Sequence, residues 1–514
     1  MTDDSLDKFA DPYEPRPGLT HRDADWSGLR VLVAGLGLSG FAAADALSER
    51  GAVVTVIDGR PHGEVTANDE RAGILDILGV EVRQGPEHTA GMPLEAGQLI
   101  DLVVTSPGWR PDQPVLLEAA ARGIPVWGEV ELAWRMRAST GAAPWLTVTG
   151  TNGKTTTVNM LAAILRAAGL RATSAGNVGT PILEAVLHPE PFDVIAVELS
   201  SFQLHWQRSV SAVASACLNV APDHLDWHGS FEEYLRAKGR IYQHTHIACV
   251  YNVADPLTEQ LVMEAEVVEG CRAIGFTLGV PAPSMLGLVD EVLADRAFVE
   301  QRQNSAAELG TLLDLQGDAP SLPPHYVANA LAAAALARAY GVGPLSVRDG
   351  LRTFRQGPHR IADVATVDGV RFVNDSKATN PHAALASLRS FERVVWVAGG
   401  LLKGADEQQL ADLVTAVSDR LRGVVLIGAD RARLADALAR HAPEVPVVDL
   451  EPPQTGPMAA LDVMDLVVER AVSLAQDGDV VLLAPAAASM DMFANYAARG
   501  DAFEAAVRRY AESH

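Results

Sequence analysis

The sequence predicts an α/β protein with three domains, and three observations support this prediction. The chain has 514 residues, which suits about three domains at roughly 100–200 residues each. Hydrophobic residues make up 48% of the chain and aromatic residues only 5%, so Ala, Val and Leu must fill most of the cores. Short continuous apolar runs alternate with helical stretches, a pattern typical of a parallel, doubly wound sheet with helices on both faces.

Charge and cysteine usage exclude several classes of protein. The formal net charge of −24 opposes non-specific binding to nucleic acids. No run of 18 apolar residues occurs, which excludes a transmembrane helix, and the acidic N-terminus lacks the apolar core of a signal peptide. Cys217, Cys249 and Cys271 show no spacing typical of a metal site or a disulfide framework. We therefore expect a cytoplasmic protein that binds neither nucleic acid nor membrane, with a flexible acidic tail over residues 1–25.

The first predicted domain, residues 26–140, opens with an apolar run that enters the turn GLGLSG, beginning at Gly35. A helical stretch over 41–50 follows, and the next strand ends at Asp58. Glycines at this spacing let the backbone approach a nucleotide diphosphate, and an acid after the second strand is typical of NAD-binding proteins. The motif alone leaves three interpretations open: NAD, another nucleotide diphosphate, or a purely structural tight turn.

The second predicted domain, residues 141–354, opens with a strand that runs into GTNGKTT, beginning at Gly150. Backbone N–H groups in such a loop close around phosphate oxygens, while Lys154 adds a positive charge and Thr155 a hydroxyl that faces magnesium. The predicted helix over 158–168 adds positive potential at its N-terminus. The alternative is a glycine-rich turn with a solvated lysine.

Three more polar residues of this domain are candidates for the same site. Glu198 ends a predicted strand, a position suited to holding magnesium, His224 lies in a loop beside two aspartates, and Lys238 lies on a predicted helix. Each also has a structural interpretation: a capping glutamate, a structural histidine and a solvated lysine. The stretch over 281–324 is irregular and predicts either a small β-rich insertion or a loop, and a helix is expected over 325–340.

The third predicted domain, residues 355–514, repeats the α/β rhythm. Its strands are expected at 370–375, 393–400, 423–428, 445–450 and 479–485. Polar turns follow three of them: NDSKATNP from Asn374, GGLLKGA from Gly399 and APAAASMD from Ala484. Ligands of open α/β sheets bind beyond the carboxyl ends of the strands, so these turns predict a binding site.

These motifs together resemble the Mur ligases, from about Leu29 to the C-terminus. The phosphate loop, the Glu198 segment, NVAPDH, the Lys238 helix and GPHR are similar to features of the whole family, and NDSKATNP is similar to its D-glutamate-adding members. The resemblance implies a Rossmann-like N-terminal domain for UDP, a central P-loop ATPase domain with a parallel sheet, and a Rossmann-like C-terminal domain for the amino acid. It implies a monomer that uses ATP and Mg²⁺, with two ions expected. The implied reaction joins D-glutamate to UDP-N-acetylmuramoyl-L-alanine through an acyl phosphate, in peptidoglycan precursor synthesis.

The resemblance also implies a role for each candidate residue. The catalytic residues would be Lys154, Glu198, His224 and a carbamylated Lys238, and the magnesium ligands Thr155, Glu198, His224 and Lys238. ATP would contact Gly150, Thr151, Asn152, Gly153, Lys154, Thr155, Thr156, Asn329, Arg360 and Asp375. The UDP portion would contact Leu38, Ser39, Gly59, Arg60 and Gly108, and the muramoyl end Asn177, Ser200 and His224. D-glutamate would contact Lys377, Thr379, Lys403, Ser489 and Tyr496.

Other functions remain open from the sequence alone. Another amino-acid-adding ligase of the family would keep every motif except NDSKATNP. A nicotinamide-dependent oxidoreductase would explain GLGLSG and Asp58 but leave the second phosphate loop without a role. A non-catalytic nucleotide-binding protein would leave the polar turns of the third domain without one. Because the substrates would bind to three domains, we expect the third domain to rotate about a hinge near 353–358.

Overall fold

The computed structural model describes residues 15–63, 66–92, 99–317, 322–355, 357, 359–451 and 457–513. Parts of three predicted features therefore lie outside the described residues: 1–14 of the tail, 318–321 of the irregular stretch, and 356 and 358 of the hinge. The chain divides into two compact units. One comprises Met1–Val220 with Leu235–Phe354, and the other comprises Ala221–Tyr234 with Arg355–His514.

The first sheet of the first unit is parallel and has the order β3-β2-β1-β4-β5. Its strands are β1 (Arg30–Ala34), β2 (Val53–Asp58), β3 (Glu81–Gln84), β4 (Leu102–Thr105) and β5 (Val126–Gly128). Its helices are α1 (Leu38–Ser48), α2 (Thr66–Ile77), α3 (Pro114–Ala121) and α4 (Glu129–Arg135). The chain reverses its direction of progress across the sheet between β1 and β4, and such a point leaves a crevice at the carboxyl ends of the strands.

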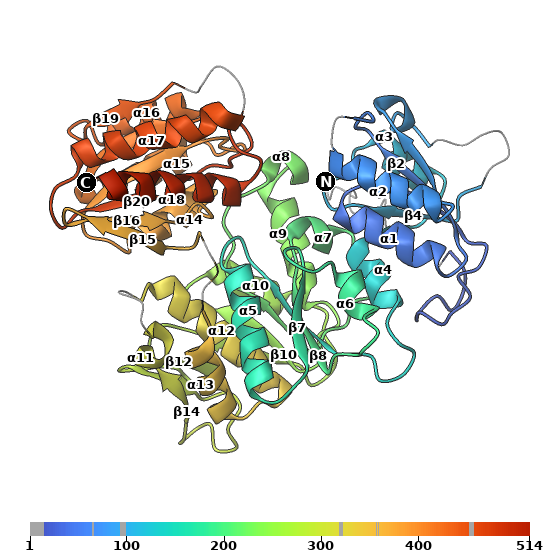
Figure 1. Ribbon diagram of the computed structural model, residues 1–514. Coiled ribbons are helices and arrows are strands. Elements are labelled where there is room, and N and C mark those ends of the chain that lie inside the picture. Colours follow the sequence, from blue (N-terminus) through green and yellow to red (C-terminus); the bar gives the residue numbers. More distant parts are fainter. Residues whose placement is uncertain are drawn as a thin grey trace. The chain divides into compact units, whose positions relative to one another are not determined.

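The second sheet of this unit has the order β14-β13-β12-β11-β10-β9-β6-β8-β7. Figure 1 labels β7, β8, β10, β12 and β14 of this sheet. Its strands are β6 (Trp145–Thr149), β7 (Ala172–Gly176), β8 (Val194–Glu198), β9 (Ala214–Cys217), β10 (Ala248–Asn252), β11 (Arg272–Phe276), β12 (Met285–Val289), β13 (Val292–Asp295) and β14 (Ala307–Thr311). Its helices are α5 (Lys154–Ala167), α6 (Ile182–Val186), α7 (Ser201–His205), α10 (Pro256–Met263), α11 (Leu312–Gln316), α12 (Pro324–Tyr340) and α13 (Pro344–Thr353). Helix α8 (Leu225–His228) belongs to the other unit, and α9 (Phe231–Gly239) is divided between the two. The irregular stretch forms mainly the antiparallel edge β12-β13-β14, which is the β-rich alternative.

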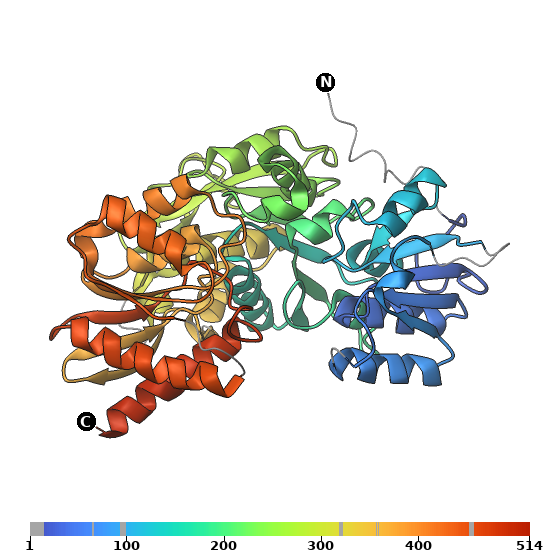
Figure 2. The same cartoon turned by 90° about the horizontal axis from the view of Figure 1, so that it is seen from above.

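The sheet of the second unit has the order β15-β16-β20-β17-β18-β19. Its strands are β15 (Ala362–Val367), β16 (Val370–Asn374), β17 (Val394–Gly399), β18 (Leu421–Ile427), β19 (Val447–Asp449) and β20 (Val480–Leu483). Its helices are α14 (Pro381–Leu388), α15 (Glu407–Thr415), α16 (Arg431–His441), α17 (Pro457–Leu474) and α18 (Tyr496–Ser513). Figure 2 shows these helices around the sheet from above.

Alternation along the strands explains why this sheet carries helices on both faces. Successive strand residues point to opposite faces. In β17, Val394 and Trp396 pack in a core with α14, α15 and α16, while Val395 and Val397 pack in a second core with α17 and α18. A continuous apolar strand such as VVWVAG is therefore buried on both sides.

β15 and α5 are among the elements that differ from the sequence prediction. Strand β15 was not predicted, and it pairs antiparallel with β16 through a two-residue turn. Asp368 and Gly369 both have positive φ there, as a hairpin of this length requires. Helix α5 begins at Lys154, four residues before the predicted start, because Gly153 at its N-cap adopts the left-handed conformation. None of the helices in the described ranges combines the length and hydropathy needed to cross a bilayer.

Candidate active site

The phosphate loop joins β6, in the middle of its sheet, to the first turn of α5. Gly150 and Gly153 have φ of 152° and 85°, which favours glycine at both positions. Asn219, which follows the neighbouring strand β9, fixes the loop from the side. Its Oδ1 accepts from the Asn152 N–H at 2.9 Å and its Nδ2 donates to the Asn152 carbonyl at 3.1 Å. This role of Asn219 was not predicted, although Asn219 is the first residue of the motif NVAPDH.

The other residues predicted to bind ATP phosphates gather at the same place. Lys154 Nζ donates to the carbonyl oxygens of Gly150 at 2.8 Å and Thr151 at 3.0 Å. Thr155 and Thr156 occupy the first turn of α5, where helix N–H groups have no intrahelical acceptor. Asn329 on α12 packs directly against the loop, since a Cβ on Gly153 would lie 2.4 Å from its Oδ1. This end of α5 can therefore hold an anion.

Glu198 ends β8, the strand that pairs with β6 on the side opposite β9. Its side chain is buried, and Oε1 accepts from Asn177 Nδ2 at 2.8 Å. The other oxygen, Oε2, is also buried and has no hydrogen-bond partner among the described residues. A buried carboxylate oxygen without a donor is costly, and a bound cation would remove that cost. The arrangement therefore fits a hard metal ion.

Lys238 on α9 is only 2% exposed. Its Nζ lies 3.4 Å from the Thr149 hydroxyl, and Thr149 immediately precedes the phosphate loop. The solvated-lysine interpretation is thus wrong for this residue. Among the described residues, no three His, Cys, Asp or Glu side chains gather as they would around a metal. The predicted magnesium ligands include only two residues of those types, Glu198 and His224. The absence of such a cluster therefore does not test the predicted magnesium site.

A cavity of about 630 Å³ lies at the carboxyl ends of β1, β2 and β4. Its lining includes all five residues predicted for the UDP portion and one predicted for the muramoyl end: Leu38, Ser39, Gly59, Arg60, Gly108 and Asn177. Ser200 is not among the lining residues. It caps α7 instead, accepting from the Gln203 N–H within a reciprocal capping box.

Two buried carboxylates form hydrogen bonds that fix the backbone around this cavity. Asp58 accepts from the Leu36 N–H at 2.8 Å and from the Arg60 N–H at 2.9 Å, so it fixes the glycine turn and the following loop together. Glu129 bonds to the Ser39 side chain and to the Ile182 N–H, and burial raises the pKa of its carboxyl. Neither residue was predicted to contact a ligand, and Glu129 belongs to no sequence motif that would have indicated its role.

In the second unit, Asp375 follows β16 and is buried. Burial raises its pKa to about 6, although the Ser387 hydroxyl donates to it and Arg360 lies near enough to favour its charged form. Asp375 and Arg360, both predicted to contact ATP, are therefore neighbours. His359 beside them is also buried, and the Asn374 side-chain amide lies 2.8 Å from its Nδ1.

Of the residues predicted for D-glutamate, Tyr496 begins α18, and the others lie on loops that follow β16, β17 and β20. Lys377 Nζ lies 3.9 Å from the centre of the Tyr496 ring. Thr379 and Lys403 line a small cavity that also includes His224, all within the second unit. Ser489 is buried, and its carbonyl accepts two backbone N–H groups of the following turn. The structure thus places His224 in the unit of the amino-acid loops, and Glu198 and Lys238 in the other.

Comparison with known proteins decides the family. Three family models match this chain: the Mur ligase MurD-like N-terminal domain over residues 29–128, the Mur ligase middle domain over 148–337, and the Mur ligase glutamate ligase domain over 359–487. The chain belongs to the Mur ligase family. Fold class and enzyme class are confirmed with it: this Mur ligase is an ATP-dependent, amide-forming ligase of peptidoglycan synthesis. An oxidoreductase and a non-catalytic protein are thereby disfavoured.

The sequence similarity to known proteins covers nearly the whole length of this Mur ligase. UDP-N-acetylmuramoylalanine–D-glutamate ligase of Streptomyces avermitilis is 58% identical over 94% of this chain and 99% of its own length. The protein of the same name from Thermobifida fusca is 55% identical, with the same coverage. Among solved structures, UDP-N-acetylmuramate–alanine ligase MurC from Thermotoga maritima aligns with a TM-score of 0.53 at 19% identity, covering 94% of this chain and all of its own. MurF from Acinetobacter baumannii aligns at 0.53 and 17%, covering 96% and 92%. The two structures support the fold.

Proposed function

We propose that this chain joins D-glutamate to the L-alanine carboxyl group of UDP-N-acetylmuramoyl-L-alanine, at the expense of ATP, as a cytoplasmic monomer. The observation that carries the proposal is the 630 Å³ cavity. Six residues expected to contact a UDP-sugar line it, and Asn177 among them bonds to Glu198, which ends the strand beside the phosphate-loop strand. A UDP-sugar in this cavity would extend its peptide end toward the bound ATP. Relatives that are 57–58% identical to this chain are named UDP-N-acetylmuramoylalanine–D-glutamate ligase.

The reaction proceeds in two balanced steps. An oxygen of the L-alanine carboxylate attacks the γ-phosphorus of ATP, the bond to the β-bridging oxygen breaks, and ADP leaves with that electron pair. The product is an acyl phosphate. The D-glutamate amine attacks its carbonyl carbon, the carbon–oxygen bond to phosphate breaks, and the departing phosphate takes the electron pair and the proton that the nitrogen loses as the amide forms. Phosphorylation is needed because a carboxylate is a poor electrophile.

Positioning and electrostatics supply the catalysis of the first step. The N–H groups of residues 150–156 and the Lys154 ammonium hold the phosphates at the N-terminus of α5. Lys154 already lies over the loop, bonded to two of its carbonyls, so it need only exchange these acceptors for phosphate oxygens. Asp375 accepts from ribose hydroxyls, with Arg360 beside it.

Glu198, Thr155 and Lys238 would hold magnesium, together with His224. The unpartnered Glu198 Oε2 is the observation that supports an ion here. When bound, magnesium neutralises negative charge on the phosphates. Lys238 is carbamylated in this proposal: a buried ammonium is costly, whereas the neutral amine can add carbon dioxide and become a carboxylate-like ligand. Enzyme prepared in ¹³C-bicarbonate should show a carbamate carbon signal that Lys238→Ala lacks.

D-glutamate carries two carboxylates, and the second unit offers Lys377 and Lys403 on neighbouring loops to bind them. The hydroxyls of Thr379 and Ser489 add hydrogen-bond donors. We place the UDP domain at 26–140, the ATPase domain at 141–354 and this amino-acid domain at 355–514. Closure about a hinge near 353–358 would exclude water from the acyl phosphate. Scattering profiles that stay identical when nucleotide and UDP-substrate are added would contradict the closure.

The test is phosphate release from ATP and Mg²⁺ with UDP-N-acetylmuramoyl-L-alanine and each of a panel of amino acids. Release should require both the UDP-sugar and D-glutamate, and mass analysis should find a product heavier by one glutamyl residue. Lys154→Ala should lose release but retain binding of the UDP-sugar. Stimulation by another amino acid would replace the proposed substrate with that one, and no acceptor-dependent release from folded protein would overturn the proposal.

A further inference from the structure

Arg499 is a buried arginine that no predicted role accounts for. It lies in the first turn of α18, three residues after Tyr496, and is 1% exposed. Arginine is rarely buried so completely, because desolvating a guanidinium is costly unless its N–H groups find acceptors. Burial lowers its pKa to about 10, and the nearby Asp491 opposes that shift, so the group stays protonated at neutral pH.

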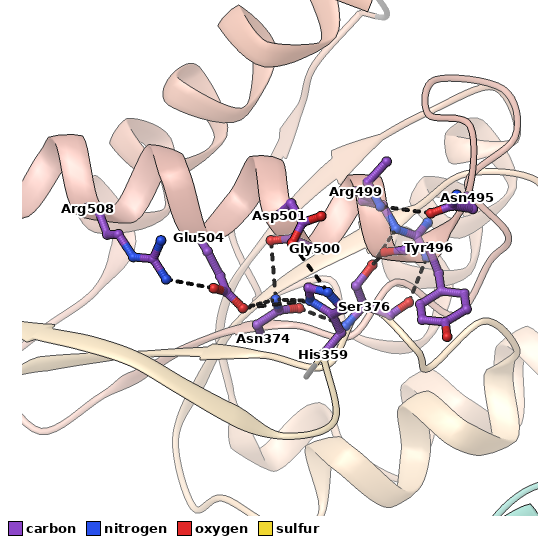
Figure 3. A network of polar contacts seen from close by, with 11 residues as sticks. His359, Asn374, Ser376, Asn495, Tyr496, Arg499, Gly500, Asp501, Glu504 and Arg508 are labelled. Carbon is purple, nitrogen blue, oxygen red and sulfur yellow. Dashed lines mark hydrogen bonds and ion pairs between the residues drawn. The ribbon is translucent and has the colours of Figure 1, made fainter. Parts of the chain in front are cut away.

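The acceptors of Arg499 lie on the loop after β16 and at the end of β17. Figure 3 shows Arg499 beside Ser376, which lies on the first of these segments. The Arg499 Nε donates to the Ser376 hydroxyl at 3.0 Å and its Nη2 to the Ser376 carbonyl at 2.9 Å. Its Nη1 donates to the Gly399 carbonyl at 3.4 Å. The Ser376 hydroxyl in turn donates to the Tyr496 carbonyl at 2.7 Å, which closes the network on the start of α18. One planar guanidinium therefore connects the end of β17, the loop after β16 and a helix N-terminus.

Both loops carry residues that the proposed function needs. Ser376 stands between Asp375, expected at the ribose, and Lys377, expected at D-glutamate. Gly399 ends β17, and the loop that leads to Lys403 follows it. This loop has little freedom near its start, since a Cβ on Gly399 would lie 1.9 Å from the Ile427 carbonyl. A shift of either loop would move a lysine away from its carboxylate, and a misplacement of about 1 Å can cost a hundredfold in rate.

We propose that Arg499 is a positioning residue, which holds the Ser376 and Gly399 loops in register so that Lys377 and Lys403 bind the two carboxylates of D-glutamate. This inference rests on the proposed function. The fork shape of the guanidinium is essential to it, because the three bonds use three separate nitrogens, Nε, Nη1 and Nη2, whereas a lysine would offer all its donors from one atom. The buried positive charge also favours a dicarboxylate over a neutral amino acid.

A purely structural arginine would behave differently. Its loss would lower the melting temperature and the fraction of active enzyme, with the Michaelis constants of the folded fraction unchanged. Loss of a positioning arginine would raise the KM values for D-glutamate and ATP, which the two loops are proposed to bind. It would leave the KM for the UDP-sugar, which binds elsewhere, unchanged. The measurements that separate these cases are the KM values for D-glutamate, ATP and the UDP-sugar, taken well below the melting temperature.

The experiment compares Arg499→Lys, Arg499→Met and Ser376→Ala with wild type, using phosphate release. Arg499→Lys should raise the KM for D-glutamate at least about tenfold and that for ATP by less, while the KM for the UDP-sugar stays within about twofold. Ser376→Ala should show the same pattern more weakly, and Arg499→Met with Ser376→Ala should be no worse than Arg499→Met alone, because the two residues share one network. Arg509→Met is the matched control: Arg509 lies on the same helix but is half-exposed and pairs with Asp465 on α17.

Unchanged KM values for D-glutamate in Arg499→Lys and Ser376→Ala, or an equal rise for all three substrates, would overturn the inference. If Arg499→Met does not fold, the KM values of Arg499→Lys and Ser376→Ala are sufficient to test the role of Arg499. Wild-type protein separates this inference from the function on which it rests. No D-glutamate-dependent release by wild type refutes the proposed function, whereas normal wild-type release with unaltered variants refutes only the role of Arg499.

Discussion

Two glycines at opposite ends of α5 provide a matched pair of substitutions. Gly153 precedes the helix with φ of 85°, and Gly169 follows it with φ of 80°. A Cβ on Gly169 would meet nothing within 4 Å, whereas a Cβ on Gly153 would lie 2.4 Å from Asn329 Oδ1. Gly153→Ala and Gly169→Ala therefore share the backbone strain and differ in the steric overlap.

The expected losses of stability and of ATP affinity follow from the backbone strain and the steric overlap. Placing alanine in the left-handed region costs about 1–2 kcal/mol at either site, which sets the expected loss of stability for Gly169→Ala. Overpacking a filled site costs about 1–3 kcal/mol more. At Gly153 this overlap either remains and lowers stability, or is relieved by moving the phosphate loop away from Asn329. In the second case the same energy opposes ATP binding, which raises the KM for ATP roughly 5- to 160-fold.

The assay combines urea unfolding with the KM for ATP from phosphate release. We expect Gly169→Ala to lose stability with an unchanged KM for ATP, and Gly153→Ala to show a further loss in stability, in ATP affinity, or in both. The KM for the UDP-sugar should stay at the wild-type value in each variant. If the two variants prove equal in stability and in ATP affinity, then the loop is not packed against Asn329 as described, and the account of the phosphate site is wrong.

Three further predictions concern other parts of the molecule. Because burial raises the pKa of Asp375 to about 6, above its unfolded value of about 3.9, its contribution to stability is present below pH 4 and lost as the pH rises through 6. Relative to Asp375→Asn, wild type should lose about 3 kcal/mol of unfolding free energy over that window, and a constant difference in urea unfolding would contradict this. A Cβ on Gly40 would lie 1.8 Å from the Gly35 carbonyl, while one on Gly37 meets nothing within 4 Å; calorimetry should therefore show a lower melting temperature for Gly40→Ala but not for Gly37→Ala, and equal values would disprove the packing argument. Lys238→Ala should nearly abolish phosphate release, with partial recovery in acetate but not in bicarbonate, and near-normal activity in the plain variant would rule out the carbamate.

Local motifs made much of this site predictable. The phosphate loop and the glycine turn each require glycine at particular backbone angles, so their residues carry a signal that needs no tertiary context. The order of strands then brings the cavity residues together, because turns after parallel strands meet at one edge of the sheet. The edge strand β15 was missed although Asp368-Gly369 is a strong hairpin signal, since the hairpin departs from the β-α-β rhythm that guided the prediction.

Other residues could not be found from the sequence for a physical reason. Asn219 braces the phosphate loop 67 residues away, which depends on β9 lying next to β6. Arg499 bonds to groups 123 and 100 residues earlier, and in the sequence it is one arginine among many on a helix with charged neighbours. Such roles arise from tertiary packing, and no local pattern records them.

The proposed ligation of D-glutamate through an acyl phosphate is tested most directly by following the oxygen atoms of the L-alanine carboxylate. UDP-N-acetylmuramoyl-L-alanine labelled with ¹⁸O at both carboxylate oxygens is incubated with the wild-type chain, ATP, Mg²⁺ and D-glutamate. One labelled oxygen becomes the bridging oxygen of the acyl phosphate and leaves with phosphate when the amine attacks. The acyl-phosphate route predicts one ¹⁸O in each released phosphate and one in the new amide. Phosphate that carries no label would contradict the acyl-phosphate route, and no D-glutamate-dependent release would contradict the proposed reaction itself.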